Sequence, residues 1–398
     1  MIYEGNCRLG DLFTSRREKG RVGLPTLSVT LNDGLVNRSD LDRKQDTNLA
    51  PEEHLLVKPG DIVYNMMRMW QGASGVADCA GLVSPAYVVL QPKECIDPLY
   101  ASYLFKTKRM VYLFWAYSYG ITEDRLRLYF PDFMRVPVLI PPIGEQRRIA
   151  KILATWERSV IESKALLLNK VATHRHLLKL LTTGHLRTGS SKRSWREVTL
   201  GEIGRTYGGL TGKTKASFGR GKPYIPYKNI FANSRINIEQ FDFVDIDTDE
   251  AQTVCKVGDI FFTSSSETPD ELGAASVLLD DVGELYLNSF SIGFRLDDFR
   301  TLLPEYARFL FRGPAIRRSL DQLAQGYTRF NLSKLALLKI RLSLPSSDEQ
   351  KAISNLLSAS EESIDILRRN IDCLIKEKDS LSARLIGDTL PRTSPAKA

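Results

Sequence analysis

The sequence predicts an α+β fold in which two similar mixed domains are separated by two long helices that form an antiparallel coiled coil. Three observations lead to this prediction: a length of 398 residues, an internal repeat, and two long stretches with heptad spacing of apolar residues. With 43% hydrophobic and 26% charged residues, the composition is typical of a folded globular protein.

The repeat consists of five short matches that keep their order along the chain, and it indicates duplication of a unit of about 200 residues. Lys-Pro-Gly-Asp-Ile at 58–62 returns as Lys-Val-Gly-Asp-Ile at 256–260. The other matches pair residues 9–12 with 200–203, 25–29 with 223–227, 98–105 with 304–311, and 141–150 with 345–353.

The first part of each unit has the pattern of a mixed α+β domain. Short β-like runs such as 61–64 and 259–262 alternate with turns rich in Gly, Asn and Ser, and one helix-like stretch follows at 100–108 or 306–312. The predicted divisions are a first domain at 1–143, a first helix at 144–188, a second domain at 189–345, a second helix at 346–387, and a disordered tail at 388–398.

The second part of each unit is predicted to be one long helix. Ser346 to Glu349 has the spacing of a capping box, and Gly387 and Pro391 mark the end of the second helix. Apolar residues then recur at alternate spacings of four and three, which is the pattern of a coiled-coil seam. The predicted seam residues are Ile149, Leu153, Trp156, Val160, Leu167, Ile353, Leu357, Ile364, Leu367, Ile371, Leu374 and Leu381.

The obvious partner for each helical stripe is its duplicate. A compact domain of this size is about 38 Å across, so it does not carry the chain back along a helix of about 55 Å. We therefore expect the second helix to return beside the first in the antiparallel direction, with the two domains at opposite ends.

The positive charge is concentrated in one segment. Residues 144–194 carry 11 Lys and Arg against 3 Asp and Glu, while the rest of the chain is near balance within a net charge of +8. Such a segment indicates binding to nucleic acid or to an acidic protein, or else a solvated helix face, and charge alone does not choose among these.

Several classes of protein are disfavoured by the sequence. No apolar run approaches the roughly 18 residues of a membrane span, and the N-terminus has no signal-peptide pattern. The five cysteines are scattered and only four histidines are present, so neither a disulfide framework nor a metal site is predicted. A reducing cytoplasm is the expected location.

No catalytic constellation is found. Gly208 to Thr214 resembles a phosphate-binding loop, but its glycines are too close together for that motif, and a flexible basic loop is the better interpretation. Glu162 and Lys164 complete a nuclease-like pattern with Pro131 and Asp132, but two residues apart on a helix they face different sides. We therefore predict that the chain is not an enzyme.

Basic and aromatic residues interleaved with amides fill several loops of both domains, and these side chains suit contacts with phosphates and base edges. The alternative for any single segment is an ordinary polar surface loop. The candidate DNA-binding residues are Arg16, Arg17, Lys19, Arg21, Asn65, Arg68, Trp70, Gln71, Arg125, Arg127, Lys213, Lys215, Arg220, Lys222, Lys228, Asn229, Ser265, Tyr327, Arg329 and Asn331.

Together these features resemble the specificity (S) subunit of type I restriction–modification systems. The resemblance covers essentially the whole chain. It rests on the duplication, on Pro-Pro-Ile-Gly-Glu-Gln at 141–146 and Pro-Ser-Ser-Asp-Glu-Gln at 345–350 before the helices, on the repeated Gly-Asp-Ile strands, and on Gly326, Thr328 and Asn331. Residues 120–125 match their counterpart only loosely, and Ser346 replaces the usual second proline.

The resemblance implies two target-recognition domains that each read one half of a bipartite double-stranded DNA sequence. It implies helices that set the spacer and dock methylation (M) subunits, with restriction (R) subunits as further partners. S-adenosylmethionine, ATP and Mg would then belong to those partners, and the complex would lie in the bacterial or archaeal cytoplasm, associated with the nucleoid. The alternative is a coiled-coil scaffold or adaptor whose domains bind protein. An autonomous nuclease or methylase is a third, weaker alternative.

Overall fold

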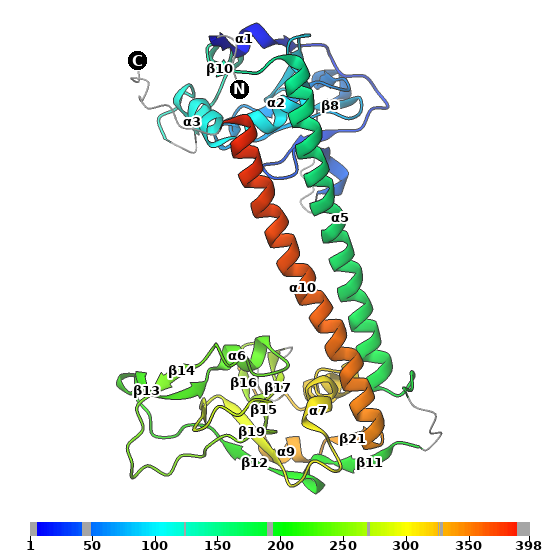
Figure 1. Cartoon of the computed structure of the whole chain (residues 1–398), viewed down its shortest axis with the longest axis vertical. Coiled ribbons are helices and arrows are strands. Elements are labelled where there is room, and N and C mark those ends of the chain that lie inside the picture. The colour runs from blue at the N-terminus through cyan, green and yellow to red at the C-terminus, as the bar shows by residue number, and fades with distance from the viewer. Residues whose placement is uncertain are drawn as a thin grey trace. The chain divides into compact units, whose positions relative to one another are not determined.

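The computed structural model describes residues 6–41, 49–122, 125–188, 194–268, 271–324, 326 and 329–387. The chain divides into two compact units, Met1–Lys164 with Arg369–Ala398, and Ala165–Arg368. Each unit combines one globular domain with one end of each long helix, so this division cuts both helices (Figure 1). The boundaries at 143, 188 and 345 stay predictions, and the tail at 388–398 lies outside the described residues.

The first domain contains short strands and helices followed by the first long helix. In order they are β1 (Asn6–Arg8), α1 (Leu9–Leu12), β2 (Phe13–Arg16), β3 (Leu27–Val29), β4 (Leu35–Asn37), β5 (Leu55–Val57), β6 (Ile62–Asn65), β7 (Ser74–Val76), β8 (Gly81–Val83), β9 (Tyr87–Pro92), α2 (Pro98–Phe105), α3 (Lys108–Ala116), α4 (Phe130–Phe133), β10 (Pro137–Leu139) and α5 (Ile143–Thr182).

The second domain has a closely similar order and ends in the second long helix. Its elements are β11 (Arg196–Thr199), β12 (Gly204–Gly208), β13 (Phe218–Ile225), α6 (Tyr227–Ala232), β14 (Asp242–Val244), β15 (Ile260–Thr263), β16 (Ser265–Ser266), β17 (Ala275–Val277), β18 (Tyr286–Leu287), β19 (Ser291–Leu296), α7 (Pro304–Leu310), α8 (Pro314–Asp321), β20 (Phe330–Asn331), α9 (Lys334–Leu338), β21 (Arg341–Leu344) and α10 (Ser347–Ile386).

The same four-stranded antiparallel sheet lies at the centre of both domains. Its strand order is β2-β9-β6-β7 in the first domain and β12-β19-β15-β17 in the second. Ile62 pairs with Leu90 in one sheet, and Ile260 pairs with Phe294 at the matching place in the other. The repeat found in the sequence is therefore a repeat of topology.

The remaining strands form smaller sheets around these centres. In the first domain β1 pairs with β10, β3 with β4 and β5 with β8, while in the second β11 pairs with β21, β16 with β20, and β13 with both β14 and β18. The pairs β1-β10 and β11-β21 join the first strand of each domain to its last strand before the long helix, so both domains are closed by the same contact.

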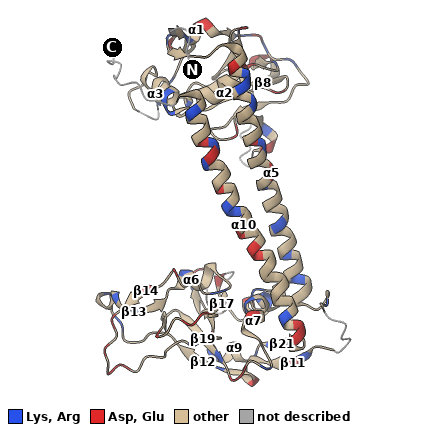
Figure 2. Cartoon of the chain, in the orientation of Figure 1, with Lys and Arg blue, Asp and Glu red and all other residues tan. Residues whose placement is uncertain are grey.

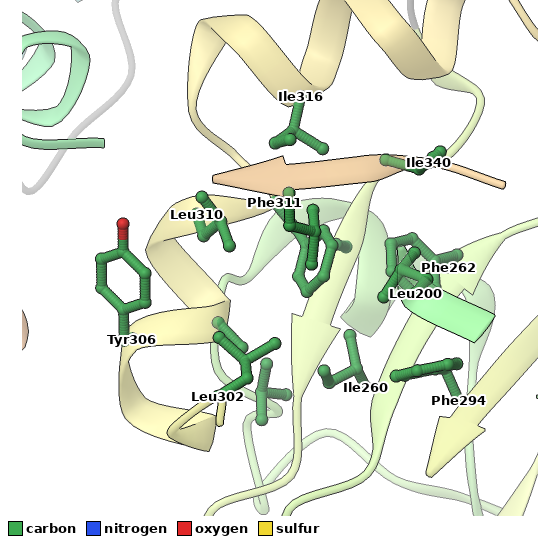
Figure 3. Close-up of a cluster of buried hydrophobic side chains, with 14 of the residues drawn as sticks. Leu200, Ile260, Phe262, Phe294, Leu302, Tyr306, Leu310, Phe311, Ile316 and Ile340 are labelled. Carbon is green, nitrogen blue, oxygen red and sulfur yellow. The ribbon is translucent and has the colours of Figure 1, made fainter. Parts of the chain in front are cut away.

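The central strands are buried because helices and loops cover them. Ile260, Phe261 and Phe262 of β15 are fully buried, which explains why these strands are continuous apolar runs without polar alternation. In the second domain Phe262, Phe294 and Phe311 lie in one cluster with residues of α7, α8 and the segment before β21 (Figure 3).

The sequence expectation of one helix-like stretch after the sheet is wrong in extent, because each domain has two short helices there. Thr107 interrupts the first stretch, where its hydroxyl accepts from the Met110 amide at 3.3 Å and so caps α3. In the second domain the break is at Gly313, followed by Pro314 in the first turn of α8. Proline lacks the amide hydrogen that a continuing helix needs, so a second helix starts there.

A buried glutamine fixes the start of each long helix. The Gln146 side chain donates to the carbonyls of Pro141 (2.8 Å) and Cys95 (3.1 Å) and accepts from the Asp97 amide at 2.9 Å. Gln350 repeats all three bonds, donating to the carbonyls of Pro345 and Thr301 and accepting from the Leu303 amide. The glutamine of the repeated Glu-Gln motif thus joins each long helix to the loop before α2 or α7 by hydrogen bonds.

Only half of the expected capping box forms at the start of α10. The Glu349 amide donates to the Ser346 hydroxyl at 3.4 Å, as predicted. The Glu349 carboxylate instead makes a two-bond ion pair with Arg187, at 2.6 and 2.8 Å. Arg187 follows the end of α5, so this pair joins the end of one long helix to the start of the other within the second unit.

Within each unit the two long helices pack against each other in the antiparallel direction. In the second unit Lys170 of α5 donates to the Ser363 hydroxyl at 2.9 Å, while His174, one turn further along α5, bonds Ser360 at 3.1 Å. In the first unit Ile149 and Leu153 share a core cluster with Ile386. In the second unit, rising numbers on α5 therefore meet falling numbers on α10.

The seam residues follow the predicted spacing. Ile149, Leu153, Val160, Ile353, Leu357, Ile364 and Ile371 are buried, and Trp156, Leu167, Leu367, Leu374 and Leu381 are partly buried. Polar positions interrupt the seam at Lys170 and His174, and there hydrogen bonds to serine hydroxyls take the place of apolar contacts. The coiled-coil pattern is therefore satisfied along each unit's part of the helices.

Candidate nucleic-acid interface

Exposed polar and basic side chains lie at the C-terminal end of the inner strand β6 in the first domain and of its counterpart β15 in the second. In the first domain the Leu128 amide donates to the Met66 carbonyl at 2.9 Å, which brings the 125–128 segment beside the end of β6. In the second domain the Leu332 amide donates to the Ser264 carbonyl at 2.9 Å beside the end of β15. The same backbone contact thus builds the same place twice, and we call these places the first and second strand-end groups.

The first strand-end group carries three exposed arginines. Arg68 lies in the turn after β6, and Arg125 and Arg127 lie on the neighbouring segment, where residue 127 forms a bridge with Tyr119. Gln71 is also exposed, and Asn65 and Trp70 are partly buried. Asn65 and Trp70 both bond backbone atoms of Met67, at 3.0 Å each, so they shape the turn that carries Arg68.

The second strand-end group holds Ser265, Arg329 and Asn331. Ser265 and Asn331 are directly paired between β16 and β20, and Arg329 is exposed beside them. An exposed amide and guanidinium, with the hydroxyl of the partly buried Ser265 beside them, match the donors and acceptors of base edges. Tyr327, the other candidate here, lies outside the described residues.

Of the four N-terminal basic candidates, one is bound to carboxylates of the protein and three are exposed. Arg16 is mostly buried, and its guanidinium bonds Asp61 at 2.7 and 3.1 Å and Glu18 at 2.6 Å. Its role in the structure is therefore to neutralise a buried carboxylate. Arg17, Lys19 and Arg21 are exposed.

The candidates around β13 are largely engaged with other protein groups. Lys213 is almost buried in an ion pair with Glu250, so this residue of the predicted basic loop is already engaged with a carboxylate. Arg220 pairs with Asp245 at 3.2 Å, and Lys222 pairs with Glu284 at 2.6 Å.

Asn229 also has a structural place. It is buried, and its side chain donates to the carbonyls of Asn237 and Gln240 and accepts from the Asn237 amide. Lys215 and Lys228 are exposed. Arg68, Arg125, Arg127 and Arg329 of the two strand-end groups are exposed and have no ion pair among the described residues, as is also true of Arg17 and Arg21 in the N-terminal segment.

Each repeated Gly-Asp-Ile motif places a buried aspartate directly before β6 or β15, and the two domains pair it with different side chains. Asp61 accepts from Arg16 of β2, whereas Asp259 accepts from Arg295 of β19 at 2.6 and 2.8 Å and from the Tyr207 hydroxyl at 2.6 Å. Tyr207 of β12 occupies the place of Arg16 of β2, because Arg16 pairs with Val89 of β9 and Tyr207 pairs with Gly293 at the matching position of β19.

The remaining buried nucleophile beside this network is inert. Burial raises the pKa of the Cys255 thiol to about 12, so it stays protonated near neutral pH, and a protonated thiol is a poor nucleophile. No group of three or more His, Cys, Asp or Glu within the described ranges is placed to hold a metal ion. In that same part of the chain, no helix combines the length and apolar character needed to cross a membrane.

The outer side of α5 is the second charged surface. Along α5, Lys and Arg outnumber Asp and Glu, whereas α10 carries more acidic than basic residues (Figure 2). In the first unit a hollow of 360 Å³ is lined by Arg147, Lys151 and Arg158 together with Leu99. Its lining is mainly basic and apolar, with Asp97 as its acidic member.

A related hollow lies in the second unit. It measures 490 Å³ and is lined by Arg175 and Lys179 of α5 and by Arg317 and Arg318 of α8, with no acidic residue in the lining. In the same unit, Leu168 of α5 is 72% exposed. An amphipathic acidic partner would match this combination of cations and exposed apolar side chains.

Two residues of the second strand-end group were missed by the sequence analysis. Phe290 is 54% exposed and lies under the Arg329 guanidinium, 6.0 Å from the ring centroid. Lys334 is exposed, with its amino group close to Gly208. Neither residue stands in a basic cluster or a motif of the sequence. Their membership of the group follows only from the folded structure, which brings their segments beside the end of β15.

Comparisons with known proteins agree with this geometry. Residues 192–376 match the family described as type I restriction modification DNA specificity domain. The type I restriction enzyme MjaVIII specificity subunit of Methanocaldococcus jannaschii is 24% identical over 84% of this chain and 80% of its own length. The putative MjaX specificity subunit of the same organism is 23% identical over 94% of this chain and 88% of its own length.

Solved structures show the same fold. The HsdS subunit of Thermoanaerobacter tengcongensis has a TM-score of 0.53 at 16% identity and covers 97% of each chain. The type I S subunit of M. genitalium has a TM-score of 0.56 at 15% identity, covering 98% of this chain and 96% of its own. Residues 192–376 therefore match the type I restriction modification DNA specificity domain, and the resemblance of the chain to type I specificity subunits that its sequence indicated is confirmed.

Proposed function

We propose that each domain reads one half of a bipartite DNA sequence through its strand-end group. The observation that carries this proposal is the repeated geometry: the same backbone contact at the end of β6 and β15 presents Arg68, Arg125 and Arg127 in one domain and Arg329 and Asn331 in the other. Arginine suits guanine edges and asparagine suits adenine edges in the major groove.

The two groups differ in side chains while the supporting sheet is the same. A shared scaffold with different exposed residues is what two readers of different half-sites need. The scaffold or adaptor alternative, in which the domains bind protein, makes no demand for arginines at these two places. The arginines therefore discriminate between the alternatives.

The experiment is to change one arginine in each domain and to determine the methylated DNA sequence in cells. Arg329→Ala should relax the half-site read by the second domain, and Arg68→Ala should relax the other, because a lost bidentate base contact costs about 1–3 kcal/mol. Arg341→Ala and Arg135→Ala, exposed arginines elsewhere in each domain, serve as matched controls. An unchanged sequence in both test variants would favour the scaffold.

The long helices have two parts in the proposal: they set the spacing between the half-sites, and the outer side of α5 docks a methylation subunit. The basic hollows of 360 and 490 Å³ and the exposed Leu168 support a protein partner with an acidic amphipathic surface. DNA phosphates would satisfy the cations but not the exposed leucine. Restriction subunits, S-adenosylmethionine, ATP and Mg enter the proposal only through the assembled complex.

A further inference from the structure

Phe290 is the most exposed phenylalanine among the described residues, with 54% of its surface accessible. It lies directly before β19, beside the end of the central strand, and its carbonyl accepts from the Ser264 amide at 3.0 Å. The ring is therefore an accessible apolar surface beside the polar side chains of the second strand-end group.

The turn that carries Phe290 is held by a buried asparagine. The Asn288 side chain accepts from the Phe290 amide at 2.9 Å and from the Ser291 hydroxyl at 3.1 Å, and it donates to the Ile225 carbonyl at 3.0 Å. Gly209 approaches the Asn288 carbonyl so closely that a Cβ would lie 1.9 Å from the oxygen. The ring is therefore presented outward by a fixed support, which is a requirement of a recognition site.

The neighbours of the ring are the candidate base-reading residues. The Arg329 guanidinium lies 6.0 Å from the ring centroid, and Ser265 pairs with Asn331 on the adjoining strands. These neighbours suit the polar edges of bases. The apolar feature that a base presents in the major groove is the 5-methyl group of thymine, and phenylalanine is among the side chains that contact it.

We propose that Phe290 is a specificity-determining residue that contacts a thymine 5-methyl group in the second half-site, beside the base met by Arg329. The inference rests on the proposed DNA-reading function and adds the chemistry of one contact to it. The residue directly before β9 in the first domain is Ala86, so the equivalent contact is absent from that place and the first half-site is an internal control.

The test measures binding of the full chain, assembled with its methylation subunits, to duplexes carrying deoxyuridine in place of each thymine in turn. Loss of the contacted methyl should weaken binding about fourfold, from roughly 0.8 kcal/mol per buried methylene-sized group and 1.4 kcal/mol per tenfold. Phe290→Ala should weaken binding to the thymine duplex and lose the uracil penalty at that one position. Phe290→Leu, which keeps an apolar side chain, should retain part of the penalty.

Phe299→Ala is the matched control, because Phe299 is 46% exposed but lies against Gly258 at the opposite end of β15. It should leave every uracil penalty in place, and the melting temperatures of all these variants should stay close to that of the unmodified chain. The inference is wrong if Phe290→Ala keeps the uracil penalties, if its affinity is unchanged, or if the second half-site contains no thymine. Loss of second-half specificity in Arg329→Ala would then still support the proposed function.

Discussion

Replacing Gln350 with alanine removes the side-chain hydrogen bonds that join the start of α10 to the second domain. Three bonds are lost: two donated to the carbonyls of Thr301 and Pro345, at 2.9 and 3.0 Å, and one accepted from the Leu303 amide at 2.9 Å. Gln350 is 1% exposed, so water does not reach these groups freely in the folded state. The backbone atoms that it serves are left without their partner.

The expected cost follows from the number of bonds. Each hydrogen bond contributes about 0.5–1.5 kcal/mol net, so three of them amount to about 3 kcal/mol. A unit of this size loses roughly 2–4 °C in melting temperature per kcal/mol, which predicts a fall of about 6–12 °C for Gln350→Ala. Gln146→Ala should do the same in the first unit, because it removes the three matching bonds.

Differential scanning calorimetry of the full chain measures this effect. Gln322→Ala is the control, since Gln322 is exposed in the same unit, and it should change the melting temperature by no more than about 1 °C. A fall of less than about 2 °C in Gln350→Ala would contradict the reasoning, because the three bonds would then contribute little to the fold. A lower melting temperature for Gln350→Ala but not for Gln146→Ala would show that the two glutamines do not contribute equally to stability.

Three further predictions concern the helices. Ile371→Asp places a charge in the buried seam and should cost several kcal/mol and cause aggregation or loss of subunit assembly, whereas Ile366→Asp, 44% exposed on the same helix, should be tolerated; equal behaviour in size-exclusion chromatography would contradict the pairing. Burial lowers the pKa of His174, so its contribution to stability should be complete above about pH 6.5 and should fall as the pH drops through the folded-state pKa. His174→Gln should remove that part of the pH dependence of the melting temperature, and an identical pH dependence in the variant would refute the prediction. Arg147→Glu with Lys151→Glu should abolish co-purification of a methylation subunit while DNA contacts survive; a change only in the salt dependence of DNA binding, by about 0.9 per lost phosphate contact, would show instead that this face meets DNA.

The features predictable from the sequence are those that depend on local spacing. The duplication, the two long helices and the twelve seam positions follow from periodicity, because burial on a helix repeats with the turn of the helix itself. The glutamines at the start of these helices were visible as a repeated motif, but two of the three bonds that each makes reach a loop about fifty residues away. Their role therefore needed the fold.

Ion pairing was not predictable for the same reason. Arg16 and Lys213 had the sequence context of exposed basic loops, yet each meets a carboxylate far along the chain, Asp61 in one case and Glu250 in the other. Phe290 had no periodic or motif context at all, and its place became visible only when β19 lay beside β15. Which polar side chains stay free is a property of the folded neighbourhood.

The most direct measurement of the central claim is the methylated DNA sequence in cells after residues 1–143 are exchanged for those of another specificity subunit. Each domain has its own core and its own strand-end group. We therefore predict that one half of the recognised sequence changes while the other half and the spacer stay the same. If the exchange alters both halves of the sequence, or leaves both unaltered in an active complex, the assignment of one half-site to each domain is contradicted.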